Sequence, residues 1–302
     1  LQRTSSRPNS LPMNPALARF VFATLWLLAP PGFAAAAVQA RPNIVVILAD
    51  DMNSHYPGFT GGRVATPNLD RLAREGVSLQ QFYVHSVCSP TRSALLTGRY
   101  PFRNGMEERA HGNDTAGMLP DERTLGEAMK EAGYDTALIG KWHLGNWYQR
   151  QLPRQRGFDH HYGLYGALVS YYTKVRERTY DWHRNGETIR EDGYTTDLLA
   201  REFERHLAAR TSDRPFFYYV PFNATHGPDE APKELVDKYR AVAASETDAD
   251  QNSRREFRAL KYAMLESLDA AVGRILTALK TKDVLANTLI VFCNDNGGRH
   301  EN

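Results

Sequence analysis

Four apolar runs of β-forming residues, separated by helical patterns, constrain the fold of this chain most strongly. Polar residues end or follow each run, and the four are "NIVVILADD", "TALIG", "FFYYVPF" and "LIVFC". Strands that are apolar on both faces and alternate with helices are typical of a parallel sheet with helices on both sides. The pattern therefore predicts an α/β fold built on a mostly parallel sheet.

Helix signals lie between these runs. Thr66 is expected as an N-cap before Pro67 at the first helical position, and Gly76 ends this helix. A second helix precedes a short strand over residues 136–139, and a long amphipathic stretch spans residues 254–280. Strands and helices thus alternate along much of the chain from the first run to the last.

Two segments lack this regularity. Residues 162–194 are aromatic, charged and poorly periodic, which predicts an insertion or a substrate-facing loop. Residues 241–253 are polar and are expected to form an exposed connection. The length of 302 residues permits one large domain or two small ones, and the net charge of +2 gives no indication of a nucleic-acid partner.

The N-terminal region has the pattern of a secretory signal. From Met13 to Ala40 the chain has a basic residue, an apolar run over residues 20–28 and then small residues, so residues 1–12 are expected to be upstream translation. The run is too short, and too close to prolines, for a stable membrane span, although a signal anchor is an alternative. We expect an exported protein, lysosomal or extracellular in a eukaryote and periplasmic in a bacterium.

Polar residues follow the apolar runs at the strand ends. Because the carboxyl ends of parallel strands share one edge of the sheet, where ligands bind in open α/β folds, these residues are expected to meet in one pocket. They are Asp50, Asp51, Lys141, His143, His226, Asp295 and Asn296.

Each of these residues also has an ordinary interpretation. An acid at a strand end often forms a turn or caps a helix, and a single loop histidine is usually solvated or hydrogen-bonded. Together, however, the carboxylates and the amide supply oxygen ligands suited to a hard cation such as Ca²⁺ or Mg²⁺, and no group of Cys and His residues has the spacing of structural zinc. The sequence therefore predicts a divalent cation in the pocket.

Cys88 opens the stretch "CSPTRSALLTGR". Pro90 is favoured at the first helical position, so Ser89 is expected as the N-cap and Cys88 just before the helix. Helical side chains tilt toward the N-terminus, so Arg92 is expected to reach back toward residue 88 and stabilise an anion there. This arrangement predicts a reactive thiol of low pKa, with an inert buried cysteine or a disulfide to Cys293 as alternatives.

The stretch "CSPTR", followed by "SALLTGR", resembles the signature C-x-P-x-R of the sulfatase family with its downstream T-G-R. Other motifs of that family follow in the same order, namely "PNIVVILADD", "GYDTALIGKWHLG", "THGP" and "DNGG". The resemblance runs from about Pro42 to Gly298 and is closest to the arylsulfatase B, I and J group. It implies an alkaline-phosphatase-like sandwich, with a large, mostly parallel sheet covered by helices on both faces.

The resemblance also implies a modified residue and a metal. A formylglycine-generating enzyme would convert Cys88 to Cα-formylglycine, and one Ca²⁺ would bind beside it. The implied calcium ligands are Asp50, Asp51, Asp295, Asn296 and an oxygen of the modified residue 88.

Roles for the remaining residues follow from the same resemblance. A hydroxyl of the hydrated aldehyde, activated by the metal and Arg92, would attack the sulfur of a sulfate ester and form a covalent sulfo-enzyme. His226 would help to protonate the leaving oxygen, and Lys141 would bind the sulfate oxygens or the hydrate. His143 would then take a proton from the second hydroxyl, so that sulfate leaves.

The implied substrates are sulfated sugars such as glycosaminoglycans, or aryl sulfates. A phosphonate or phosphate-diester hydrolase, and an inactive form that binds sulfated glycans, are the alternatives. The family places a further lysine after "DNGG" and a C-terminal antiparallel subdomain, so residues 41–302 are expected to be an incomplete catalytic domain with greatly reduced or absent turnover. Two sequons, at Asn113 and Asn223, would permit N-glycosylation, although Asn223 lies beside His226.

Overall fold

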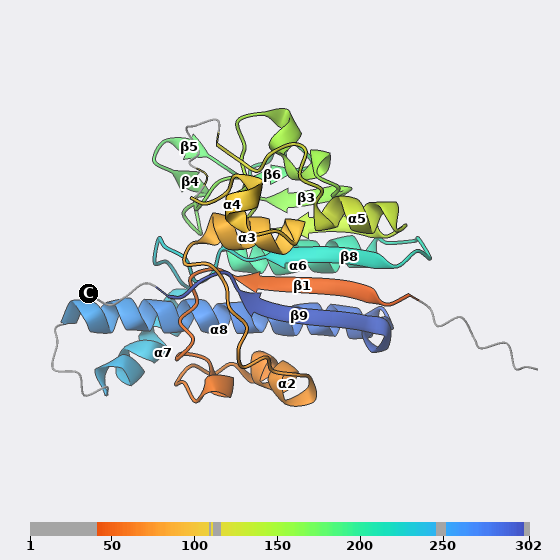
Figure 1. Cartoon of the computed structure of the whole chain (residues 1–302). Coiled ribbons are helices and arrows are strands. Elements are labelled where there is room, and N and C mark those ends of the chain that lie inside the picture. The colour runs from red at the N-terminus through yellow and green to blue at the C-terminus, as the bar shows by residue number, and fades with distance from the viewer. Residues whose placement is uncertain (1–40, 109, 111–115, 246–251, 299–302) are drawn as a thin grey trace, which may run out of the picture. The chain divides into compact units, whose positions relative to one another are not determined.

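A mixed sheet of seven strands forms the centre of the molecule (Figure 1). Five neighbouring strands are parallel in the order β3-β2-β8-β1-β9, and β6 and β7 extend the β3 edge in antiparallel pairing. The predicted α/β fold with a mostly parallel sheet is confirmed. The strands are β1 (Asn43–Ala49), β2 (Asp135–Ile139), β3 (His160–Gly163), β6 (His183–Arg184), β7 (Glu187–Thr188), β8 (Phe216–Pro221) and β9 (Thr288–Asn294).

The computed structural model describes residues 41–108, 110, 116–245 and 252–298. All of these lie in one compact unit, Arg41–Asn302. The predicted signal segment and the sequon at Asn113 lie outside the described residues. Among the described helices, none combines the length and the apolar character that a membrane crossing requires.

Helices cover both faces of the sheet (Figure 1). Val45 and Ile47 of β1 pack in one core with residues of the helices behind the sheet, whereas Val46 and Leu48 pack in a second core with Leu96 on the other side. This alternation follows from the twofold side-chain period of a strand. The helices are α2 (Pro67–Glu75), α3 (Cys88–Thr97), α4 (Pro101–Asn104), α5 (Leu125–Glu131), α6 (Thr195–Ala208), α7 (Lys233–Ala244) and α8 (Asn252–Thr281).

Helix α2 begins at Pro67 and ends before Gly76, as predicted. Thr66 precedes it, but its hydroxyl makes no capping bond to the backbone of the helix. The hydroxyl instead donates to Asp70 Oδ1 at 2.7 Å and accepts from the Gly58 amide at 2.8 Å. The signal therefore located the helix correctly, while the side chain ties the helix to the preceding loop.

Helix α3 begins two residues earlier than predicted. Val87 is the N-cap, in an extended conformation, and Cys88 is already the first helical residue. The expectation of Ser89 as N-cap and Pro90 at the first position is therefore wrong. The first turn of a helix contains amides without intrahelical acceptors, so proline is tolerated at several of its positions and does not fix the start by itself.

Residues 162–194, predicted as an insertion or a substrate-facing loop, contain short strands rather than one continuous loop. They complete β3, form the hairpin β4 (Val175–Arg176) and β5 (Thr179–Tyr180), and add β6 and β7 to the sheet. Tyr162, Tyr171 and Trp182 are buried in the core. Strands of two residues are too short to show an alternating pattern, so the segment gave no periodic signal.

Two further expectations need correction. The exposed connection predicted over residues 241–253 includes the end of α7, where Ala243 is fully buried, and the start of α8, while residues 246–251 lie outside the described residues. The edge strand β9 is not covered on both faces, because Leu289 and Val291 are 53% and 38% exposed. Coverage by helices holds for the central strands, where β1 and β8 are almost wholly buried.

Candidate active site

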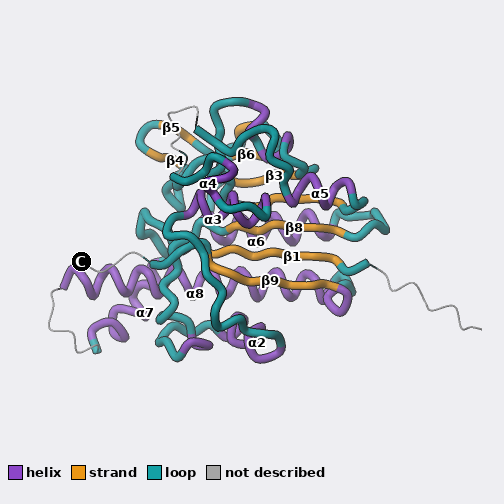
Figure 2. The backbone as a smooth tube through the Cα atoms, viewed as in Figure 1, coloured by secondary structure: helices purple, strands orange, loops and turns teal. Residues whose placement is uncertain are grey.

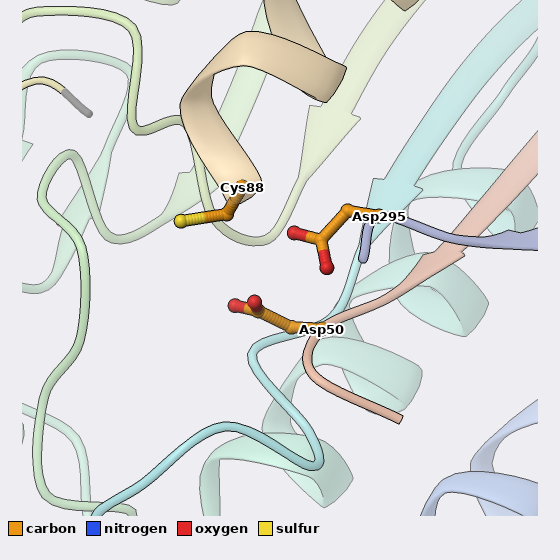
Figure 3. A group of neighbouring side chains, drawn as sticks. All are labelled: Asp50, Cys88 and Asp295. Atoms are coloured by element: carbon orange, nitrogen blue, oxygen red, sulfur yellow. The ribbon is translucent and has the colours of Figure 1, made fainter. Parts of the chain in front are cut away.

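The carboxyl ends of the parallel strands meet at one edge of the sheet, where loops gather (Figure 2). Asp50 follows β1, Lys141 follows β2 and Asp295 follows β9, while Cys88 opens α3 beside them. Figure 3 shows the side chains of Asp50, Cys88 and Asp295 around a common space. All four side chains are buried or nearly so, and the predicted convergence of distant residues is present.

Two cations neutralise the carboxylates of this cluster in part. Lys141 Nζ lies 2.5 Å from Asp50 Oδ2. Arg92 donates from Nη2 and Nε to Asp295 Oδ2, at 2.7 and 3.1 Å, and its Nη2 lies 3.4 Å from Asp50 Oδ2. Charged groups that are buried away from water are stable only when they are paired with opposite charges. The pairs therefore hold both carboxylates at fixed positions.

Two oxygens in the pocket have no hydrogen-bond partner within the described residues. They are Asp50 Oδ1 and Asn296 Oδ1, and both are buried. Burial and the neighbouring Asp50 carboxylate raise the pKa of Asp295 to about 7. Buried acceptors without donors, together with two carboxylates in close proximity, fit a hard divalent cation.

Asp51 completes this group of oxygens. Its amide donates to Asp295 Oδ1 at 3.2 Å, and its carboxylate accepts from Asn296 Nδ2. Ligand atoms of Asp50, Cys88 and Asp295 lie within 4.8 Å of one another, as do those of Asp50, Asp51 and His226. The residues expected to hold a metal are thus adjacent.

Cys88 and His143 are in direct contact. Cys88 Sγ lies 3.2 Å from Nδ1 of His143, and Nε2 of His143 lies 2.9 Å from the carbonyl of Ala110. A carbonyl only accepts, so Nε2 carries the proton and Nδ1 presents its lone pair to residue 88. Burial, then the nearby Lys141, lowers the pKa of His143 well below its usual value, which keeps the ring neutral.

The expectation of a low-pKa thiol is wrong. Burial raises the pKa of Cys88, and Asp50 adds to the increase, while Lys141 opposes it. The disulfide alternative also fails, because Cys88 and Cys293 are both free. A neutral buried thiol is a poor nucleophile, so the surroundings of Cys88 do not favour thiolate chemistry.

Arg92 does not make the contact that was expected. Its guanidinium bonds to Asp295 and, through Nη1 at 3.2 Å, to the carbonyl of Lys141, rather than to Cys88. Arg92 therefore fixes the carboxylate of Asp295 and the loop after β2, and acts on residue 88 through its charge.

His226 stands at the open side of the pocket. Its Nε2 lies 3.6 Å from Asp51 Oδ2, and its Nδ1 lies 2.7 Å from the carbonyl of Gly227. The carbonyl assigns the Nδ1 proton, so Nε2 is the atom that exchanges a proton with a ligand. Burial, then Lys141, lowers the pKa of His226 to about 4.

Sequence analysis missed three residues that position the site. Ser89 Oγ donates to the carbonyl of His143 at 2.9 Å, and Lys261 Nζ donates to the carbonyl of Thr225 at 2.6 Å. The Tyr171 hydroxyl lies 2.8 Å from the carbonyl of His226. Ser89 follows Cys88 directly and could have been found from that position, whereas nothing local marks Lys261 or Tyr171.

Asn223 belongs to one of the two sequons. It is only 2% exposed, and its Nδ2 donates to Thr195 Oγ1 at 3.2 Å. A glycan on this side chain would displace a buried contact two to three residues from His226. The folded chain therefore does not present Asn223 for modification.

Comparisons with known proteins find a matching family model and similar relatives. Residues 42–302 match the family model described as Sulfatase. The chain is 33% identical over 275 residues to arylsulfatase J of Mus musculus, covering 88% of this chain and 44% of that protein. It is 31% identical over 318 residues to an arylsulfatase of Klebsiella aerogenes, covering 88% of this chain and 68% of that protein.

A solved structure shares the fold. The crystal structure of Ps i-CgsB in complex with k-i-k-neocarrahexaose has a TM-score of 0.76 and 32% sequence identity, over 86% of this chain and 59% of that chain. The chain therefore spans between 44% and 68% of the lengths of these three proteins. With a family model matched from the first strand onward and relatives at this identity, the chain belongs to the sulfatase family.

Proposed function

We propose that this protein hydrolyses sulfate esters of carbohydrates, with Cys88 converted to formylglycine and a Ca²⁺ beside it. Membership of the sulfatase family supports the reaction class. The observation that carries the proposal is the contact of 3.2 Å between Cys88 Sγ and a neutral His143, within a cluster of buried carboxylates. The sulfur stands where an oxygen on the same carbon of formylglycine would lie.

The oxygen ligands of the pocket support the metal. Asp50, Asp51, Asp295 and Asn296 would hold the Ca²⁺, and the two buried oxygens without partners would gain one. A bound Ca²⁺ would supply positive charge for the sulfate oxygens and for the oxygen of residue 88. Lys141 would add a second cation at the same place, since its ammonium already lies at Asp50.

His143 is placed to move a proton at residue 88. The hydrated aldehyde of formylglycine supplies one hydroxyl for attack on sulfur and a second whose loss of a proton releases sulfate. Nδ1 of His143 faces that position with a free lone pair, because Nε2 is held by Ala110. His143 therefore accepts the proton that sulfate release requires.

His226 is placed on the leaving-group side. Since its Nδ1 proton is engaged with the carbonyl of Gly227, it delivers a proton only from Nε2, and only when the ring is doubly protonated. The anionic sulfate of a substrate and the carboxylate of Asp51 would favour that cation. His226 would then protonate the leaving alcohol oxygen.

The test combines mass spectrometry with turnover. The protein would be produced together with a formylglycine-generating enzyme, and the peptide carrying residue 88 would be weighed; formylglycine has a lower mass than cysteine. Aryl sulfate turnover should require Ca²⁺ and fall at least about a thousandfold in Cys88→Ser, because the nucleophile is lost. Cys293→Ser, which removes the other free thiol, is the matched control and should retain turnover.

The alternatives give other outcomes. Faster turnover of a phosphonate monoester than of an aryl sulfate would favour phosphonate hydrolysis. An unmodified Cys88 with tight binding of sulfated glycans and no turnover would favour the binding form. Unchanged sulfate turnover in Cys88→Ser would contradict the proposed chemistry.

A further inference from the structure

A hollow of about 400 Å³ lies beside His226. His226, Gly227 and Pro228 line one side of it. On the other side it is lined in part by Ser170 and by the tip of the β4–β5 hairpin, with Arg176 and Glu177. The hollow therefore adjoins His226, to which the proposed function gives the leaving alcohol, and no site carboxylate lines it.

The hairpin and the His226 loop are held together by shared contacts. Glu230 Oε2 accepts from the Tyr171 amide at 2.6 Å and from Ser170 Oγ at 3.0 Å. The Tyr171 hydroxyl contacts the carbonyl of His226. The buried Lys174 ammonium donates to the carbonyls of Tyr172 and Gly193, at 2.8 and 2.6 Å. These contacts fix the base of the hairpin relative to His226.

Arg176 keeps most of its hydrogen-bonding capacity. Its side chain is 39% exposed, and its Nε lies 3.9 Å from Oε1 of Glu177, whose side chain is 76% exposed. A pair so long and so exposed to water neutralises little of the charge. Two other arginines of this region are engaged: Arg184 bonds to Glu202 at 2.9 Å, and Arg190 lies over the ring of Tyr180 at 4.6 Å.

We propose that Arg176 binds an anionic substituent on the leaving alcohol, so that the protein selects acidic sulfated saccharides. The substituent is a carboxylate or a second sulfate ester, and both present oxygens in a plane or cone that a guanidinium engages by two N–H bonds. The location next to His226 places this group on the sugar that departs. This inference rests on the proposed function of the site.

The test uses three sulfated disaccharides that share the same scissile sulfate. One carries a carboxylate on the leaving sugar, one carries a second sulfate, and one carries neither. In Arg176→Gln, which keeps the hairpin backbone pairing, the Kd and KM of an anionic disaccharide should rise about tenfold, because a charge-assisted bidentate contact is lost. The neutral disaccharide should change by less than about twofold.

Arg178→Gln is the matched control. Arg178 lies two residues away, at the exposed turn of the same hairpin, and should leave all three ligands unchanged. Glu177→Gln should tighten binding of the anionic disaccharides, since it removes the carboxylate beside Arg176. Which of the two anionic ligands loses more affinity in Arg176→Gln identifies the substituent.

Failure of this inference is distinguishable from failure of the proposed function. Calorimetric binding does not need turnover, and aryl sulfate turnover does not need Arg176. An equal effect of Arg176→Gln on all three disaccharides, or an equal effect of Arg178→Gln, would overturn the assignment of Arg176 even when aryl sulfate is hydrolysed. An unmodified Cys88 in protein produced together with a formylglycine-generating enzyme would instead count against the reaction.

Discussion

Among the described residues, two of the buried clusters of charge differ in how completely they are paired. The first is the site, with Asp50 and Asp295 beside Arg92 and Lys141. The second surrounds Glu202 of α6, which is 3% exposed. Its carboxylate accepts from His160 Nε2 at 2.8 Å, Arg184 Nη2 at 2.9 Å and Arg205 Nε at 2.9 Å.

The pKa values of Glu202 and Asp295 are shifted in opposite directions. Although burial opposes it, hydrogen bonds from His160, Arg205 and Arg184 lower the pKa of Glu202. Burial and a second carboxylate raise the pKa of Asp295 instead. A buried carboxylate whose oxygens are fully hydrogen-bonded stabilises the fold by itself. A pair of carboxylates that is only partly hydrogen-bonded and neutralised is stabilised by a ligand. Only the first cluster therefore has the properties of a binding site.

The largest expected effect is that of Asp50→Asn. At about 100 times its Kd, Ca²⁺ should stabilise the unmutated protein by roughly 2.7 kcal/mol, and the variant should lose this increment. The variant also leaves Lys141 without its buried partner, which costs roughly 3 kcal/mol more. Thermal unfolding with and without Ca²⁺ measures both losses of stability. If Ca²⁺ stabilised Asp50→Asn as much as the unmutated protein, the assignment of this cluster as the metal site would be contradicted.

Glu202→Gln should lower the free energy of unfolding by about 3 kcal/mol at pH 7, because it breaks a buried ion-pair group. Its Ca²⁺ shift should remain, which separates the two clusters. The lowered pKa contributes stability above the unfolded pKa of about 4.3, and this contribution disappears as pH falls toward the folded value. The difference in the free energy of unfolding between the unmutated protein and Glu202→Gln, measured with urea, should therefore shrink below about pH 4.3. A constant difference would show that Glu202 acts through packing alone.

Ser89→Ala should have an intermediate effect. The buried hydroxyl donates to His143 and accepts from the Ala110 amide at 3.1 Å, so its loss should cost about 1 to 2 kcal/mol of stability. Turnover should fall too. The Ser89 hydroxyl holds the carbonyl of His143 and the amide of Ala110, and the carbonyl of Ala110 holds Nε2 of the His143 ring. Ser93→Ala is the matched control, since Ser93 is buried on the same helix and bonds only locally, to Pro90. Equal loss of turnover in the two variants would remove the positioning role of Ser89.

Glu75→Gln should have the smallest effect. It breaks the pair between Arg71 Nε and Glu75 Oε2, which are 3.0 Å apart on side chains that are 52% and 56% exposed. A pair of this exposure is worth less than about 1 kcal/mol and weakens with added salt. Urea unfolding should detect little change. A loss of free energy of unfolding as large as that in Glu202→Gln would show that burial does not decide how much an ion pair contributes to stability.

Much of the fold follows from local patterns. The apolar strands β1, β8 and β9 identified a parallel sheet, and the polar residues after them were expected to meet because parallel strands share one carboxyl edge. Helix α2 was located by Thr66, Pro67 and Gly76. These predictions succeeded because each depends on a period or a terminal residue within a short window.

Other features depend on contacts between distant segments. The hairpin of β4 and β5 and the added strands β6 and β7 are defined by their partners, so their residues carry no period of their own. The pKa of Cys88 is raised by burial and by the charge of Asp50, and it is lowered by Lys141. The interpretation from the helix terminus and Arg92 considered only the favourable charges and therefore gave the wrong sign.

The sequence by itself determined that the chain is an α/β protein with acids, cations and a cysteine at one sheet edge. Tertiary structure alone decided how they are paired: Arg92 with Asp295, Lys141 with Asp50, and His143 with Cys88. The reason is that hydrogen bonding and desolvation depend on distances of a few ångströms between residues far apart in the chain, which no local pattern specifies.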